Sequence, residues 1–182
     1  MKYQAKTYRL KDESQIEIRT PTLKDAQNLV NLKRSYIKNT TTIPMNLNEY
    51  PNDATKEKEI IHEYTGSSNS ILLVAEHDGK LIGNIDLTGS KRFKMQHTGM
   101  IGMGIGEEWR NKGLGKLLIK EVIDWAKKSS IIELVWLDVY SSNKLGINLY
   151  KNTGFTVSGI IKGFFKEVDG YKDKIQMYQQ IK

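Results

Sequence analysis

The sequence contains no cysteine and only three prolines among its 182 residues. Without cysteine the chain can form no disulfide, no cysteine-ligated zinc site and no acyl-enzyme on a cysteine nucleophile. We predict no metal site. The absence of a disulfide framework suits a reducing compartment, so we expect a cytoplasmic protein.

Long apolar runs are also absent. The segment Met1–Lys6 lacks the apolar stretch of a signal peptide, and no run approaches the roughly 20 residues that a membrane-spanning helix needs. We therefore expect no membrane segment. With 38% hydrophobic and 27% charged residues, the chain has the composition of one globular domain over residues 1–182.

The charge is unbalanced toward the positive sign. The chain has 28 Lys and Arg against 21 Asp and Glu, a formal net charge of +7. A positive field attracts nucleic acid, anionic lipid or an anionic small molecule, and composition alone does not choose among them. The lysines are spread along the chain, which makes a nucleic-acid-binding module the weaker alternative and leaves a polyanionic cofactor open.

Hydrophobic periodicity indicates an α/β fold. We expect strands at residues 6–10, 15–19, 71–75, 81–87, 99–105, 133–139, 155–161 and 171–181, and helices at 23–37, 54–64, 114–126 and 143–151. Residues 39–53 carry turn formers and are expected to form a loop. This order predicts a mixed, twisted sheet with helices on both faces and a right-handed crossover at its centre.

The most informative stretch is a glycine-rich, positively charged turn that leads into an amphipathic helix. One helical stripe is formed by Leu114, Leu117, Leu118, Val122, Trp125 and Ala126, so the helix begins near Gly113. A helix start presents unpaired backbone N–H groups, and Arg110, Lys112 and Lys116 add positive charge. The pattern predicts a phosphate or pyrophosphate site, with an ordinary glycine-bearing turn as the alternative.

The strand before this turn contains Gly102 and Gly104. Glycines in a strand permit a close approach to the backbone, or a bulge that splays the strand from its neighbour. The alternative is that they only allow tight packing against Trp109 or the following helix.

These segments resemble the GCN5-related N-acetyltransferase (GNAT) family over nearly the whole chain. The segment Arg110-Asn111-Lys112-Gly113-Leu114-Gly115 is similar to the acetyl-CoA motif of that family. Further along, Asn143, Leu149-Tyr150 and Gly154-Phe155 are similar to its second signature. The closest likeness is to the branch that acetylates amino acids, antibiotics and the N-termini of ribosomal proteins. Splayed central strands are part of the fold that the resemblance implies.

The resemblance implies an enzyme that transfers an acetyl group from acetyl-CoA to a primary amine of a small molecule or peptide. The implied cofactor-binding residues are Met103, Ile105, Arg110, Asn111, Lys112, Gly113, Leu114, Gly115, Lys116, Asn143 and Tyr150. The backbone N–H near Ile105 is implied as the donor to the thioester oxygen. Tyr150 corresponds to the general acid and Asn143 to a second catalytic residue, which can also cap the last helix. With no cysteine present, the amine should attack directly in a ternary complex.

Several points stay open in the sequence. The strand before the turn carries no acidic residue, so the base that deprotonates the amine is not assigned; the candidates by position are Glu107, Glu108, Asp86 and His97. Residues 39–53, Asp86, Phe164 and Phe165 are expected near the acceptor. An acyl chain longer than acetyl is an alternative donor, and the closing strands could pair across a homodimer.

Overall fold

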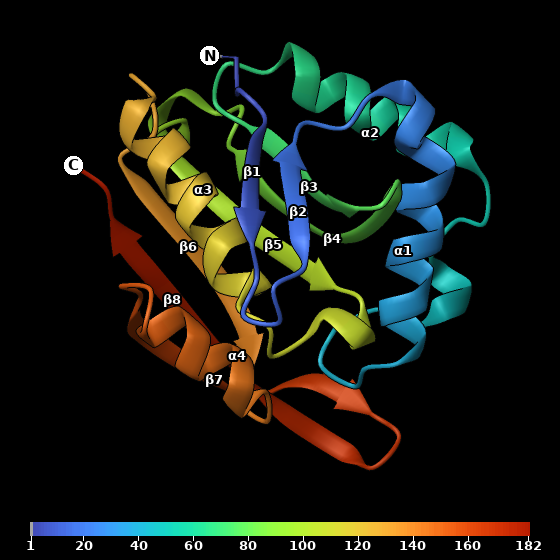
Figure 1. Cartoon of the computed structure of the whole chain (residues 1–182). Coiled ribbons are helices and arrows are strands. Elements are labelled where there is room, and N and C mark those ends of the chain that lie inside the picture. The colour runs from blue at the N-terminus through green and yellow to red at the C-terminus, as the bar shows by residue number, and fades with distance from the viewer. Residues whose placement is uncertain (1) are drawn as a thin grey trace.

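The computed structural model describes residues 2–182 and contains an eight-stranded mixed sheet in the order β1-β2-β3-β4-β5-β6-β8-β7 (Figure 1). The strands are β1 (Lys6–Arg9), β2 (Gln15–Arg19), β3 (Ile71–His77), β4 (Lys80–Gly89), β5 (Thr98–Ile105), β6 (Leu134–Tyr140), β7 (Thr156–Glu167) and β8 (Gly170–Gln180). The expected mixed sheet is confirmed. One domain over residues 1–182 stays a prediction, and Met1 lies outside the described residues.

Helices cover both faces of the sheet, as the periodicity predicted (Figure 1). They are α1 (Ala26–Lys38), α2 (Ala54–Gly66), α3 (Leu114–Lys128) and α4 (Lys144–Lys151). The stripe of α3 packs into the larger core together with Ile147 of α4, whereas α1 and α2 form a second core with β3 on the opposite face. None of the helices within residues 2–182 combines the length and the hydropathy of a membrane span.

The central strands β5 and β6 are parallel and are joined through α3, which gives a crossover connection whose right-handedness stays a prediction. Their pairing covers only Thr98–Met100 against Leu134–Trp136. Beyond Met100 the two strands separate, and their carboxyl ends diverge in Figure 1. The opening between residues 101–105 and 137–140, here called the wedge, lies beside the first turn of α3 and confirms the expected splayed strands.

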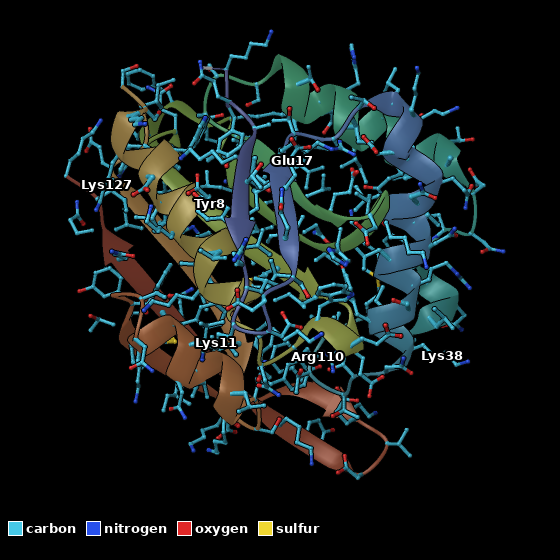
Figure 2. The ribbon with its side chains drawn as sticks, in the orientation of Figure 1. Tyr8, Lys11, Glu17, Lys38, Arg110 and Lys127 are labelled. Carbon is cyan, nitrogen blue, oxygen red and sulfur yellow. The ribbon has the colours of Figure 1, made fainter. Side chains whose placement is uncertain are left out.

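The N-terminal hairpin is tied to α3 through a buried carboxylate. Glu121 accepts hydrogen bonds from Tyr3 (2.9 Å), from Lys6 (2.6 Å) and from Tyr8, which is labelled in Figure 2. A buried carboxylate is stable only when such donors replace its water. This network holds β1 and the β1–β2 turn against the helix that begins at the glycine turn.

The C-terminal hairpin is longer than the sequence pattern predicted. β7 continues to Glu167, and the chain returns through a tight turn into β8 at Gly170, which has φ +119°. The register shifts between Ile161 and Phe165 show a bulge, which breaks the alternation that marks a strand in the sequence. β7 forms one edge of the sheet, and a homodimer paired along it stays a prediction.

Candidate active site

The turn before α3 exposes unpaired backbone donors. Asn111 and Gly113 have φ values of +64° and +93°, so the chain makes a tight reversal that glycine favours. Gly113 is the N-cap of α3 and provides no side chain to accept from the first N–H groups. By contrast, the first N–H groups of α2 and α4 have side-chain acceptors, the carboxylate of Asp53 and the amide oxygen of Asn143. The start of α3 is therefore suited to bind an anion from outside the chain.

The predicted cations of this turn have different surroundings. The Arg110 Nε atom donates to the carbonyl oxygen of Ile105 at 3.3 Å, which fixes its stem at the end of β5. The Lys112 ammonium lies 2.9 Å from a carboxylate oxygen of Asp12 and lowers the pKa of that carboxyl to about 2. Lys116 is exposed. Arg110 and Lys112 thus have protein partners, and Lys116 is open to a ligand.

Sequence reasoning missed Lys11, which the fold brings to the same turn. Its backbone N–H donates to the carbonyl oxygen of Lys112 at 3.2 Å, and its side chain passes beside Gly113. Figure 2 labels Lys11 and Arg110 at the end of the molecule where the β1–β2 turn meets this segment. No local motif signals this contact, because more than 90 residues separate Lys11 from its neighbours in the turn.

Gly115 is explained in part by packing. A Cβ atom at Gly115 would lie 2.9 Å from Leu149 of α4 and 3.3 Å from Ile105 of β5. Leu114 is buried against the same core. The absence of a side chain at Gly115 therefore lets α4 approach the first turn of α3, which brings the second sequence signature next to the first.

The backbone of β5 presents hydrogen-bonding groups to the wedge. Gly106 donates to the carbonyl oxygen of Ile82 on the β4 side, and Glu133 donates to the carbonyl oxygen of His97 on the β6 side. Along a strand the bonding direction alternates, so odd-numbered residues of β5 face β6. Met103 and Ile105 lie beyond the last paired residue and therefore direct their N–H groups into the wedge. The C=O of Met103 faces the same way, whereas the C=O of Ile105 accepts from Arg110.

Gly102 and Gly104 of β5 face the side of the sheet that α1 and α2 cover. A Cβ atom at Gly104 would lie 2.2 Å from the ring of Tyr36, whose hydroxyl donates to buried Asn84 at 3.1 Å. Tight packing therefore explains Gly104, although the partner is α1 and not Trp109 or α3 as the alternative held. A Cβ atom at Gly102 would lie 2.9 Å from Oδ1 of Asp86.

Tyr150 lies on α4 and is partly buried against the larger core. Its ring meets Phe155 edge to face, with centroids 5.8 Å apart. Burial raises the pKa of the Tyr150 phenol to about 12, so the hydroxyl keeps its proton near neutral pH. The hydroxyl makes no hydrogen bond to any residue in the range 2–182 that the structure describes, which leaves its proton available to a ligand.

Asn143 is the N-cap of α4, as one of its predicted roles required. Its Oδ1 atom accepts from the backbone N–H of Gly146 at 2.9 Å. A Cβ atom at Gly146 would lie 2.7 Å from Nδ2 of Asn143, so glycine at this position makes room for the capping side chain. The capping bond uses Oδ1 and leaves the Nδ2 donor for a ligand.

Asp86 occupies the face of the sheet opposite α3. Its Oδ2 atom accepts from the hydroxyls of Tyr64 (3.1 Å) and Thr88 (3.2 Å). Burial raises the pKa of Asp86 above its usual range. Lys33 and Glu57 form a nearby ion pair of 2.7 Å.

The other candidate bases lie in less suitable places. Glu107 and Glu108 are exposed on a short 3-10 turn, as solvated residues would be. His97 precedes β5, where β5 and β6 are still paired, and borders a surface hollow with Phe93 and Glu133. Among residues 2–182, no group of three or more His, Asp and Glu side chains is placed to hold a metal ion.

The segments expected near the acceptor are ordered by specific contacts. Arg34 of α1 donates to the carbonyl oxygens of Leu47 and Tyr50, which holds the loop at residues 39–53 against α1. Phe165 stacks on Tyr140 of β6 with ring centroids 3.8 Å apart. Phe164 covers the Lys174 ammonium at 4.1 Å. The hairpin thus brings Phe165 of β7 against Tyr140 of β6, the strand that forms one side of the wedge.

Two curated proteins from Escherichia coli strain K12 resemble the chain. The L-amino acid N-acetyltransferase AaaT is 27% identical over 105 residues, 58% of this chain and 65% of AaaT. The [Ribosomal protein bS18]-alanine N-acetyltransferase is 31% identical over 78 residues, 43% of this chain and 52% of that protein. The chain therefore spans between about half and two thirds of these relatives.

The fold has a solved counterpart in an acetyltransferase of the GNAT family from Streptococcus pneumoniae, with a TM-score of 0.88 and 27% identity over 92% of this chain and 99% of that one. The Acetyltransferase (GNAT) family matches residues 37–155, which include the glycine turn, the wedge and α4. The chain belongs to the acetyltransferase (GNAT) family.

Proposed function

We propose that this protein is an acetyl-CoA-dependent N-acetyltransferase that transfers the acetyl group to a primary amine of a small molecule or peptide. The main support is that two segments with unpaired backbone groups lie next to each other. The uncapped start of α3 provides N–H groups for a pyrophosphate, and it lies beside the wedge, where β5 no longer pairs with β6. A cofactor that combines an anionic head with an extended amide-bearing arm matches this junction.

Each part of the site has a role toward the cofactor. The N–H groups of residues 113–116, with Lys116 and Lys11, are placed to hold the pyrophosphate, and Arg110, Asn111, Lys112 and Leu114 shape the turn. Met103 offers its backbone N–H and C=O groups to the pantetheine arm, and Asn143 offers its Nδ2 donor. Ile105 offers its N–H to the thioester end of that arm, since its C=O already accepts from Arg110. Bound acetyl-CoA supplies an acetyl thioester that an amine can attack.

The residues of the chain then assist the transfer. The N–H of Ile105 donates to the thioester oxygen as that oxygen gains negative charge. Tyr150, which retains its proton because burial raises its pKa to about 12, gives that proton to the departing sulfur. No cysteine is present to carry the acetyl group, so the amine attacks directly.

The relatives support an amine acceptor. One is named for acetylating L-amino acids and the other for acetylating an alanine of a ribosomal protein. Both names describe N-acetylation, but they differ in whether the acceptor is a free amino acid or a protein. An amine acceptor is their common element.

The test is a turnover screen with acetyl-CoA over amino acids, aminoglycosides, polyamines and N-terminal peptides, measured by thiol release with a disulfide reagent. Because the chain has no cysteine, the protein itself contributes no thiol signal. We expect at least one primary amine to release CoA in step with formation of its N-acetyl product. Binding of acetyl-CoA without transfer to any amine would contradict an amine acceptor. Faster turnover with a longer acyl-CoA would show that the acyl donor is that longer acyl-CoA and not acetyl-CoA.

A further inference from the structure

The carboxylate of Asp86 stands at the point where the wedge opens. In the β4–β5 register Asp86 lies opposite Gly102, two residues beyond Met100, the last residue of β5 that pairs with β6. The missing side chain at Gly102 makes room for Oδ1, which would lie 2.9 Å from a Cβ atom there. The Asp86 carboxylate therefore lies over β5 where that strand no longer pairs with β6, on the face of the sheet opposite α3.

The two oxygens of this carboxylate differ. Oδ2 accepts from Tyr64 and Thr88, and Oδ1 has no hydrogen-bond partner in the part of the chain that the structure describes. The groups that face the carboxylate are Lys33 and Tyr36 from α1, Glu57 and Tyr64 from α2, and Thr88 from β4. None of the described cations forms an ion pair with Asp86, because Lys33 is bound to Glu57.

We propose that Asp86 is the general base of the transfer, with Oδ1 taking a proton from the acceptor amine. This inference rests on the proposed function and assigns the one role for which the sequence provides no motif. The hydroxyls of Tyr64 and Thr88 hold the carboxylate through Oδ2 and leave Oδ1 directed to the amine. The acceptor then enters from the side of α1 and α2, while the cofactor lies in the wedge.

The proton transfers balance over the whole reaction. An ammonium loses one proton to Oδ1 of Asp86, and its nitrogen lone pair then forms the N–C bond with the acetyl carbon. The C–S bond breaks with its electron pair on sulfur, which takes the phenolic proton of Tyr150. The nitrogen loses a second proton, which restores Tyr150, and Asp86 releases its proton to solvent. The products are the N-acetyl amine, CoA thiol and one proton.

The other acidic groups on this face are occupied. Glu57 is buried and bound by Lys33 and by Tyr50, whose hydroxyl lies 2.5 Å from Oε2. Asp138 of β6 is paired with Lys174 at 2.8 Å. A carboxylate that already neutralises a cation is a weaker base toward a new ammonium. Asp86 has no such cation, and burial raises its pKa, which brings its basicity closer to that required near neutral pH.

Asp86→Asn tests the assignment, because asparagine keeps the shape of the side chain and loses the base. The probe is the amine of the screen that the unmodified chain acetylates fastest. We expect kcat/KM to fall by roughly 100-fold or more and the Kd for acetyl-CoA to stay within about twofold. The unmodified enzyme loses activity as pH falls through the pKa of Asp86, and the variant should lack that step. Its residual rate should follow the fraction of free amine.

Two variants complete the experiment. Asp86→Glu should recover part of the rate and keep a protonation step. If melting curves show that Asp86→Asn is unfolded, Asp86→Glu becomes the test, because its longer side chain displaces the carboxylate from the amine and should lower kcat/KM. An unchanged kcat/KM and pH profile in Asp86→Glu would then overturn the base assignment. Glu107→Gln removes an exposed carboxylate that is also a candidate by position and should keep kcat/KM within about twofold. An active Asp86→Asn enzyme with the unmodified pH profile would overturn the base assignment and leave the proposed function intact. Failure of the unmodified chain to bind acetyl-CoA, or to acetylate any amine, would overturn both.

Discussion

The two sides of the central sheet present different chemical groups at the wedge. On the side of α3, the site consists mainly of backbone: an uncapped helix start, a reversal at Gly113 and the free edge of β5. On the side of α1 and α2, it consists of side chains, in which tyrosine and threonine hydroxyls surround the carboxylates of Asp86 and Glu57.

Under the proposed function, this difference follows from what each side would recognise. A pyrophosphate and an amide-bearing arm are bound by N–H and C=O groups, which every residue carries, so the sequence only has to keep side chains out of the way. An amine must be held and deprotonated, which requires ionisable side chains. A substitution in the glycine turn on the α3 side should therefore change cofactor affinity, and one beside Asp86 on the α1 and α2 side should change the pH dependence of turnover. Tyr150 of α4 differs from the turn, because its proposed role is to protonate the departing sulfur.

Tyr150→Phe should have the largest effect among variants outside Asp86. Loss of the phenolic proton donor is expected to lower kcat by roughly 100-fold, with the Kd for acetyl-CoA unchanged. Rapid kinetics and calorimetry measure the two quantities. Tyr3→Phe is the matched control, since it removes a hydroxyl that binds Glu121 on α3 and should leave kcat unchanged. An equal loss of kcat in both variants would remove the acid role from Tyr150.

Gly113→Ala should weaken the cofactor side alone. A residue with a side chain at φ +93° is strained by about 1–2 kcal/mol, so the turn should change shape and the Kd for acetyl-CoA rise by about tenfold. Gly79→Ala places similar strain in the β3–β4 turn, at φ +76°. Both variants should lower the melting temperature, and only the first should change the Kd. Equal Kd values would mean that the turn does not hold the cofactor.

Tyr64→Phe should affect the acceptor side alone. Its hydroxyl stabilises the charged form of Asp86, so its loss raises the pKa of that carboxyl. Because Asp86 must be deprotonated to act as a base, the acidic limb of kcat/KM should move to higher pH, and the rate at pH 7 should fall about threefold. Tyr8→Phe, which removes a donor to Glu121, should leave the limb in place. If the acidic limb does not move in Tyr64→Phe, the Tyr64 hydroxyl does not affect the pKa of the general base.

Lys11→Ala should have the smallest effect. An exposed cation beside Gly113 contributes less than about 1 kcal/mol, so the Kd for acetyl-CoA should rise about twofold to fivefold at low salt and less at high salt. Lys127, labelled in Figure 2, is an exposed lysine near the other end of α3, and Lys127→Ala is the matched control. Identical salt-dependent shifts in both variants would indicate a general field effect and not a contact at the turn.

The fold was largely predictable because its signals are local. The stripe of α3 and the order of strands are visible in the sequence, and the structure confirms both. The extent of β7 was not predictable, since the bulge near Gly163 breaks the two-residue alternation. Pairing with β8, and not local pattern, decides where that strand ends.

The site divides in the same way. Gly113 and Gly115 lie in one short motif next to the helix they serve, so the sequence predicts their neighbourhood. Lys11 reaches the turn only because Glu121 and the β1–β2 hairpin hold it there. Asp86 was one of four candidates by position and was also expected near the acceptor, and the β4–β5 register distinguishes it further by setting it opposite Gly102. Such long-range placement leaves no local signal.

The most direct test of the central claim is the melting temperature of the purified chain with and without acetyl-CoA. A ligand at about 100 times its Kd stabilises the folded state by about 2.7 kcal/mol, which for a chain of this size predicts a rise of roughly 5–10 °C. That rise, reduced in Gly113→Ala and kept in Asp86→Asn, is the predicted result. An unchanged melting temperature with saturating acetyl-CoA and with CoA would contradict the assignment of the glycine turn and the wedge as the cofactor site.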